Sequence, residues 1–266
     1  MTAFHVSHGP RRIVCLTEEP TEILYALGEG ERVVGISAYT LRPPEAPRDK
    51  PVVSAFIGGS VKKIKALAPD LVIGFSDIQA DLARELIREN LDVLIFNQRS
   101  IQEILDVVLA VGRLVDRKLE AERLVSQYIA GLEAAAARAA LRQRRPRVYF
   151  EEWDEPMICC IRWVSELIEL AGGEDVFRER SFGESAAERK LTVEDVQRAA
   201  PDVLLACWCG KPFDAEKARA RPGMDRVPAV QNGRMHDIPP EIILQPGPAS
   251  LTDGLRYLER VLAEPA

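Results

Sequence analysis

Hydrophobic and polar residues follow a pattern along the chain that occurs twice. Residues 60–73 and 192–205 both read as a short amphipathic helix, a Pro-Asp pair and then a continuous apolar run. A proline ends a helix because it lacks an amide hydrogen and biases the preceding residue toward extended geometry. The two copies therefore predict two lobes of similar construction.

A second pair of segments precedes these copies. In each half an apolar strand is followed by a segment of helical periodicity, at residues 21–28 and 165–172. We expect a hydroxyl residue to cap each helix at its start and a left-handed glycine to end it. These caps are Thr21 and Gly28 in the first half and Ser165 and Gly172 in the second. Buried strands that alternate with helices imply parallel sheets covered on both faces, so the predicted fold class is α/β with two Rossmann-like lobes.

One long helix is predicted to join the lobes. Residues 116–145 contain a single glycine, Gly131, and no proline, and their apolar positions mostly recur at helical spacing. About 26 residues of helix at 1.5 Å per residue span ~39 Å, enough to cross the backs of both lobes. We therefore expect an N-terminal lobe over residues 1–115, the linking helix over 116–145 and a C-terminal lobe over 146–266. The alternative is one helix among several in a single domain.

The ends of the predicted strands are the candidate binding site, because ligands of such sheets bind beyond the carboxyl ends of the strands. All three tryptophans of the chain fall at these positions, although aromatic residues make up only 6% of it. A tryptophan joins a large apolar surface to an N–H group that needs a partner, which suits the wet edge of a cleft between lobes. The alternative is that each tryptophan only plugs a loop against its own lobe.

Composition narrows the function further. The formal net charge is −6 and the basic residues form no stripe, which disfavours a nucleic-acid partner. No apolar run approaches the ~20 residues of a membrane-spanning helix. The first residues lack the basic and apolar regions of an export signal, so the chain as written is expected in the cytoplasm. Its five cysteines are expected to be reduced thiols; they are Cys15, Cys159, Cys160, Cys207 and Cys209.

The sequence offers little for catalysis. It contains no glycine-rich phosphate loop and no G-x-S-x-G turn. Glu151 and Glu152 are adjacent, so on a strand they would point to opposite sides and form no catalytic pair. His236 is expected in a strand. Cys207 and Cys209 are expected on one face of a strand, as buried small residues rather than as ligands of a soft metal. We therefore expect a binding protein and no enzyme.

Several motifs resemble one family, the class III substrate-binding proteins of bacterial ABC importers. They are Arg-Ile-Val at 12–14, Glu-Ile-Leu-Tyr-Ala-Leu-Gly at 22–28, Ala-Pro-Asp-Leu-Val at 68–72 and Val-Pro-Ala-Val at 227–230. The resemblance covers nearly the whole chain and is closest to the cobalamin-binding branch, through residues 151–154 and 245–248. It implies a monomer of two lobes joined by a rigid helix, with cobalamin or a related corrinoid bound in the cleft and no required cofactor or metal of its own.

A corrin has broad apolar faces and a rim of neutral amides, so its contacts should be aromatic rings, hydroxyls and carboxamides. By position, the candidates are Tyr39, Phe56, Phe75, Trp153, Trp163, Trp208 and Gln245. Arg99 and Arg162 would suit an anionic edge of the ligand, and the alternative for them is an ion pair with Glu152 or Asp154.

The resemblance also implies docking to an ABC permease through one glutamate on each lobe. Glu194 occupies that position in the second lobe, but the matching residue of the first lobe is Lys62. A basic residue there would meet like charge. This leaves two possibilities: a corrinoid carrier or sensor in the cytoplasm, or a periplasmic or surface-anchored protein whose start is misassigned or trimmed.

Two other functions stay open from the sequence. A ferric siderophore or haem binder would use the same scaffold with basic residues in the cleft. An enzyme or iron–sulfur protein on a nitrogenase-like bilobal fold would need the cysteines to converge from several strands.

Overall fold

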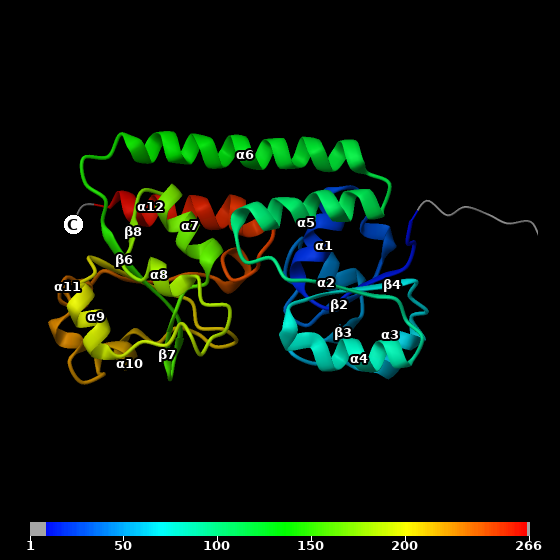
Figure 1. Cartoon of the computed structure of the whole chain (residues 1–266), viewed down its shortest axis with the longest axis horizontal. Helices are drawn as coiled ribbons and strands as arrows, with labels where there is room; N and C mark the ends of the chain where they lie inside the picture. The colour runs from blue at the N-terminus through cyan, green and yellow to red at the C-terminus, as the bar shows by residue number, and fades with distance from the viewer. Residues whose placement is uncertain (1–8, 265–266) are drawn as a thin grey trace, which may run out of the picture. The chain divides into compact units, whose positions relative to one another are not determined.

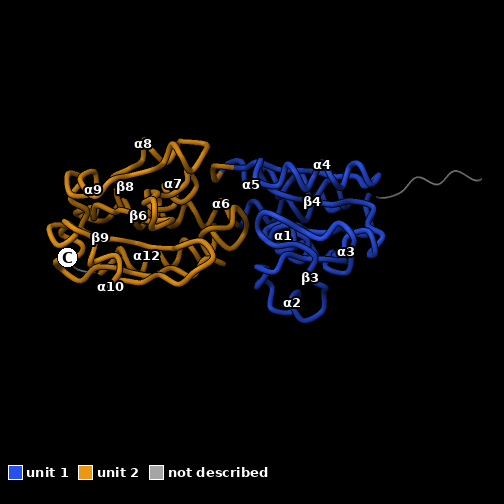
Figure 2. The backbone as a smooth tube through the Cα atoms, turned by 90° about the horizontal axis from the view of Figure 1, so that it is seen from below, with its two compact units in different colours: residues 1–98, 102–127 blue, residues 99–101, 128–266 orange. Residues whose placement is uncertain are grey.

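A computed structural model describes residues 9–264, and the chain divides into two compact units. The first unit runs to Gln98 and includes Gln102–Gln127, and the second comprises Arg99–Ile101 and the chain from Tyr128 onward (Figure 2). The boundary at Gln127 lies inside helix α6 (Lys118–Ala140), so this one helix contributes to both units. The predicted long helix therefore exists.

Unit 1 is built on a five-stranded sheet in which every neighbouring pair is parallel, as predicted. The order is β3-β2-β1-β4-β5, so the first strand lies in the middle. Its strands are β1 (Ile13–Cys15), β2 (Val33–Ser37), β3 (Val52–Ser54), β4 (Leu71–Phe75) and β5 (Val93–Phe96). Its helices are α1 (Glu18–Ala26), α2 (Ala46–Asp49), α3 (Val61–Ala66), α4 (Ala80–Arg88) and α5 (Ile101–Leu114), the first residue of α5 belonging to unit 2.

Helices cover both faces of this sheet (Figure 1). Ile64 of α3 and Leu82 and Leu86 of α4 pack with Val14 and Val72 of the central strands, which gives one face its apolar core. Helices α1 and α5 lie on the opposite side. The alternation of strand and helix in the sequence thus produces the doubly covered sheet that buried parallel strands require.

Unit 2 contains a sheet of order β10-β9-β6-β7, with β8 beside β6. Its strands are β6 (Arg147–Asp154), β7 (Met157–Cys159), β8 (Glu174–Asp175), β9 (Val203–Ala206) and β10 (Met235–Asp237). The prediction of a purely parallel sheet is wrong here, because β7 runs antiparallel to β6. Only Glu155 and Pro156 separate the two strands, and a parallel pair would need a crossover of a dozen residues or more.

The helices of unit 2 also lie on both sides of its sheet (Figure 1). They are α7 (Arg162–Leu170), α8 (Arg178–Ser181), α9 (Val193–Ala199), α10 (Ala215–Arg219), α11 (Pro228–Gln231) and α12 (Leu255–Ala263). The second half of α6 is fastened to α12 by Arg138, whose Nε and Nη2 donate to Glu259 at 2.8 and 3.0 Å. Arg142 donates to the carbonyl oxygens of Glu259 and Leu262 at the end of the same helix.

The Pro-Asp repeat has one structural role in both units. The carboxylate of Asp70 accepts the backbone N–H groups of Arg11 and Arg12 at 2.7 and 2.8 Å, and Asp202 accepts that of Arg147 at 2.8 Å. The aspartate that follows each helix therefore caps the beginning of the first strand of its unit. The bonded partners lie close together in space although they are 55 to 59 residues apart in sequence. Both Pro-Asp pairs therefore make the same tertiary contact.

The predicted helix ends are correct and two predicted helix starts are wrong. Gly28 and Gly172 follow α1 and α7 with φ of 77° and 90°, the left-handed geometry expected of them. The helices start earlier than predicted, however, after Thr17 and Ile161. A hydroxyl residue within a helix looks like a cap when apolar periodicity is weak in the preceding turn. Thr192 is a cap, with a reciprocal bond to Asp195.

Two helical glycines provide a matched test of packing. A Cβ at Gly112 in α5 would lie 2.3 Å from the Cβ of Ala121 in α6, whereas one at Gly131 in α6 would meet nothing within 4 Å. We expect Gly112→Ala to lower the free energy of unfolding by about 1–3 kcal/mol through overpacking. Gly131→Ala should raise it by about 0.5–1 kcal/mol through helix propensity. Urea denaturation followed by far-UV circular dichroism measures both, and a stabilising Gly112→Ala would contradict the close approach of the helices.

Candidate functional site

Exposed apolar side chains gather at the carboxyl end of the unit 1 sheet. Tyr39 follows β2, and Phe56 and Ile57 follow β3, with 46%, 37% and 67% of their surfaces exposed. Leu41 and Ile78 lie in the same set of loops and are also exposed. Water-exposed apolar groups at the functional end of a parallel sheet are a suitable surface for an apolar ligand. We call these five residues the apolar rim.

A buried glutamine holds part of this rim in place. Gln79 accepts the backbone N–H of Phe75 and donates to the carbonyl oxygen of Phe56, both at 3.0 Å. The loop after β3 is thereby tied to the end of β4. Phe75, at the end of β4, is itself buried and is therefore not part of the exposed rim.

Two carboxyl groups are buried at the same end of the sheet. Glu18 and Glu19 form the first turn of α1, directly beyond β1, and Thr17 donates a hydrogen bond of 2.8 Å to Glu19. Burial raises the pKa of both, and with the neighbouring charge of Glu18 it raises that of Glu19 to about 8. At neutral pH Glu19 is therefore mostly protonated and carries little negative charge.

Glu151 is the centre of a buried polar network at the carboxyl end of the unit 2 sheet. Its carboxylate accepts hydrogen bonds from the Trp208 indole and the Tyr149 hydroxyl, both at 2.9 Å, and a bidentate ion pair from Arg221. Burial, followed by the charge of Glu151, raises the pKa of Tyr149 well above its ordinary value. This network orients the Trp208 ring, which is only 2% exposed.

Two lysines pair with Asp154, and one of them also lies beside both Trp153 and Trp208. Lys211 and Lys217 donate to Asp154 at 2.5 and 2.6 Å. Burial alone would raise the pKa of Asp154, but these two lysines outweigh it and hold that pKa at about 2. The ammonium of Lys211 also lies 4.2 Å from the centre of the Trp153 ring and 4.9 Å from that of Trp208.

Other predicted site residues have partners within unit 2. Trp163 is 3% exposed and donates to the carbonyl oxygen of Ile243 at 3.0 Å. Arg162 pairs with Glu166 on the next helical turn at 2.8 Å. The suggested ion pairs of Arg162 with Glu152 or Asp154 are therefore wrong: Glu152 pairs with Arg189, and Asp154 with the two lysines.

Arg99 and Gln245 both belong to unit 2 and lie in segments outside its strands and helices. Arg99 is partly buried. Gln245 is nearly buried, and its Oε1 accepts no hydrogen bond from the described residues. Buried polar atoms without a partner are rare, so this oxygen is a candidate contact for a ligand donor.

Four cations at the end of the unit 2 sheet were missed from the sequence. They are Arg189, Lys211, Lys217 and Arg221. Their acidic partners Glu151, Glu152 and Asp154 are 37 to 70 residues away, and no local pattern marks such pairs. The nearest available signal is that three of the four follow Trp208 within 13 residues.

The cysteines are free thiols, as predicted. Cys207 and Cys209 lie beyond the end of β9, so the expected placement of both on one face of a strand is wrong, and Cys209 is partly exposed rather than buried. Burial raises the pKa of Cys15 and of Cys159 to about 12. His236 lies in β10, as expected. Across residues 9–264 no three of His, Cys, Asp and Glu come together in a way that could hold a metal ion.

In the same part of the chain no helix has the length and apolar character needed to cross a bilayer.

Lys62 and Glu194 occupy equivalent places in the two units. Each is the second residue of its helix, α3 or α9, after a valine and a hydroxyl cap, Ser60 or Thr192. Both side chains are exposed. The charge difference noted in the sequence is therefore a difference between corresponding surface positions.

Comparison with known proteins decides the family. Residues 13–242 match the family described as periplasmic binding protein. The chain belongs to that family. Periplasmic binding proteins take up solutes without chemical change, so this protein is a binder and not an enzyme.

Three proteins illustrate its relatives. An uncharacterized ABC transporter substrate-binding lipoprotein, YvrC, of Bacillus subtilis is 24% identical over 95% of this chain and 80% of its own. A vitamin B12-binding protein of Vibrio vulnificus is 26% identical over 90% of this chain and 86% of its own. The apo structure of the periplasmic heme-binding protein RhuT from Roseiflexus matches with a TM-score of 0.78 and 26% identity, over 96% of this chain and all of that one.

These names bear on the predicted location. The family is named for the periplasm, and one relative is named as a lipoprotein. The cytoplasmic location expected for this periplasmic binding protein from its first residues finds no support among them.

Proposed function

We propose that this periplasmic binding protein captures a corrinoid, cobalamin or a close relative, and delivers it to an ABC importer. The observation that carries the proposal is the apolar rim of unit 1 combined with the paired cations of unit 2. Each cation at the end of the unit 2 sheet already has an acidic partner, with Asp154 serving two of them. Such surfaces suit a ligand with apolar faces and neutral polar edges. The relatives named as vitamin B12-binding proteins also support a corrinoid as the ligand.

The contacts we propose follow from exposure, except for Gln245, which is buried but whose carboxamide oxygen has no partner among the described residues. In unit 1 they are Tyr39 and Phe56, which are exposed beyond their strands. In unit 2 they are Trp153, Gln245 and Arg99, with Arg162 at the edge of the ligand. Trp163, Trp208 and Phe75 are buried, so we propose that they support the contacting residues from below.

A ferric chelate or haem is the second candidate. The heme-binding protein RhuT is as similar in identity as the B12-binding relatives. Lys211 and Lys217 share a single carboxylate, so one positive charge of this pair is in excess. That excess could meet a ligand carboxylate, which cobalamin lacks.

Delivery would follow the location and docking of related binding proteins. We propose a periplasmic or surface-anchored protein, in line with its named relatives. Glu194 is exposed on α9 and is the proposed docking residue. Lys62 at the equivalent place requires a permease surface of opposite charge on that side.

Titration with cyanocobalamin, haemin and a ferric hydroxamate tests the proposal. All three tryptophans lie in unit 2, so quenching of their fluorescence reports binding there. We expect cyanocobalamin to bind, and at 100 times its Kd to add about 2.7 kcal/mol of stability. A Tyr39→Ala, Phe56→Ala double variant should lose about 10-fold or more in affinity. Leu141→Ala, exposed just beyond α6, should not change it. Binding of haemin without cyanocobalamin would replace the first candidate by the second.

A further inference from the structure

Strand β5 forms an open edge of the unit 1 sheet. It pairs with β4 alone, and the N–H groups of Val72 and Ser76 donate to the carbonyl oxygens of Asp92 and Phe96 at 2.9 and 2.7 Å. In a parallel pair, every second residue of a strand bonds to the neighbouring strand, and the backbone groups of the residues between them point to the other side. The backbone groups of Val93 and Ile95 therefore face away from β4, and no described residue bonds to them.

The opposite edge of the same sheet is protected. At β3, the loop after the strand folds back, so that Ser54 bridges to Gly59 and Ser60 donates to the carbonyl oxygen of Val53 at 2.9 Å. Strand β5 has no such cover among the described residues. It also carries neither a charge nor a proline, the usual devices that keep an edge strand from pairing.

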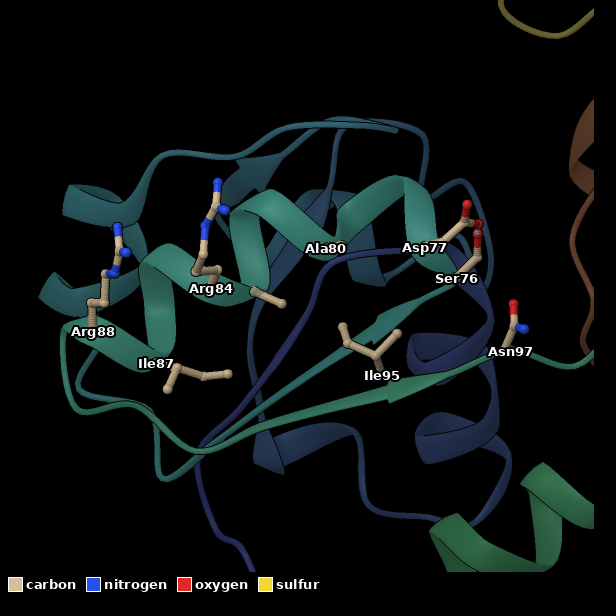
Figure 3. Close-up of a pocket in the computed structure, with 9 residues that line it drawn as sticks. Ser76, Asp77, Ala80, Arg84, Ile87, Arg88, Ile95 and Asn97 are labelled. Carbon is tan, nitrogen blue, oxygen red and sulfur yellow. Dashed lines mark hydrogen bonds between the residues drawn. The ribbon is translucent and has the colours of Figure 1, made fainter. Parts of the chain in front are cut away.

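An apolar hollow adjoins this open edge. It has a volume of about 660 Å³ and lies between α4 and β5, with Ala83 and Ile87 on the helix and Ile95 on the strand. Figure 3 shows the side chains of Ile87 and Ile95 in the space between the two elements. Ile87 is 58% exposed, so the hollow is open to a partner.

Two arginines line one end of the hollow, and Asp77 lines the opposite end (Figure 3). Arg84 and Arg88 lie along α4 beside the hollow (Figure 3). Arg84 has only an exposed pair with Asp81 at 2.7 Å, which is worth little. Arg88 has no ion pair within residues 9–264. A partner that covers this surface is therefore favoured if it brings acidic groups.

We propose that the edge of β5 and the adjoining hollow form a docking site for an extended, acidic segment of a partner protein. The segment adds a strand to the sheet through the backbone groups of Val93 and Ile95. On the face toward α4, one apolar side chain enters the hollow beside Ile95. Acidic side chains of the segment meet Arg84 and Arg88 at the end of the hollow away from Asp77, and side chains on one face of a strand recur every second residue.

A second copy of the chain fits this edge less well. Antiparallel pairing of two β5 strands about a two-fold axis would set the two α4 helices on the same face of the joined sheet. Arg84 and Arg88 of both copies would then approach each other, and like charges at an interface oppose association.

A synthetic peptide tests the site in the full chain. The probe is an acetylated, fluorescein-labelled heptapeptide, Thr-Glu-Thr-Val-Thr-Glu-Thr, whose binding is measured by fluorescence anisotropy. We expect binding that falls 10-fold or more in the Arg84→Glu, Arg88→Glu variant. The same peptide with lysine in place of both glutamates should bind that variant better than the native protein. A Lys62→Glu, Lys63→Glu variant makes the same charge change on the exposed face of α3 and should leave binding unchanged.

Backbone and assembly readouts complete the test. Amide hydrogen exchange should slow at Ile95 when the peptide is bound. The proposal is wrong if the native protein does not bind the peptide, if the double arginine variant binds it equally well, or if Ile95 gains no protection. It is also wrong if light scattering finds a dimer that Ile95→Lys dissociates, because the occupant is then a second copy. Cyanocobalamin binding by the arginine variant should be unchanged, which separates this result from the ligand proposal.

Discussion

Replacing Arg221 by methionine is expected to lower the free energy of unfolding of unit 2 by about 3–5 kcal/mol. Glu151 is fully buried, and Arg221 is the only cation that the described residues place against it. Methionine fills much of the same volume but leaves the carboxylate with only the Trp208 and Tyr149 hydrogen bonds. An ionised group stranded in the interior costs far more than the loss of an exposed pair.

Tryptophan fluorescence during urea denaturation measures this effect in the right place, since all three tryptophans lie in unit 2. The control is Arg219→Met, two residues away, whose pair with Glu216 at 3.9 Å is exposed and should contribute about 0.5 kcal/mol or less. Adding Glu151→Gln to Arg221→Met should restore part of the stability, because the unpaired charge is removed. If the double variant is no more stable than Arg221→Met, an unpaired charge is not the cause of the loss.

The same network shows why the fold was easier to predict than the site. The Pro-Asp repeats mark the two units because the aspartate and the helix before it are adjacent in sequence. Each aspartate then reaches a strand 55 to 58 residues away, at Arg12 or Arg147, without changing the local pattern. Local patterns of this kind indicate the type and succession of helices and strands.

The position of Trp208 at a strand end was also predictable, but its burial was not. Arg221 and Lys217 come from segments after the strand and approach the Trp208 ring to 5.9 and 5.8 Å. Phe213 packs edge-on against the same ring at 5.1 Å. Periodicity cannot show which later residues fold over a loop, so an exposed ring and a covered one look the same in the sequence. The direction of β7 was missed for a related reason, since a two-residue connection leaves no helical segment to detect.

Unit 1 should be less stable at neutral pH than at acidic pH because of Glu19. Its pKa is raised from 4.5 to about 8, mainly by burial and then by Glu18. Between these two values the folded state holds a proton that the unfolded state has released. Stability therefore falls as pH rises through this window, at up to about 1.4 kcal/mol for each pH unit. At pH 7, 2.5 pH units above 4.5, the cost is about 3 kcal/mol.

Glu19→Gln should remove most of this cost, because a carboxamide is neutral at every pH and still accepts the hydrogen bond that Thr17 donates. We expect the variant to be about 2–3 kcal/mol more stable than the native protein at pH 7 and nearly equal to it at pH 4. Unit 1 contains no tryptophan, so the measurement is hydrogen exchange of the β1 amides, Ile13 to Cys15, across this pH range. Glu31→Gln, at an exposed position of the same unit, should leave the pH profile unchanged. A native profile that rises from pH 5 to pH 8 would mean that Glu19 is stabilised as a carboxylate, and the neutral state assigned to Glu19 at pH 7 would have to be abandoned.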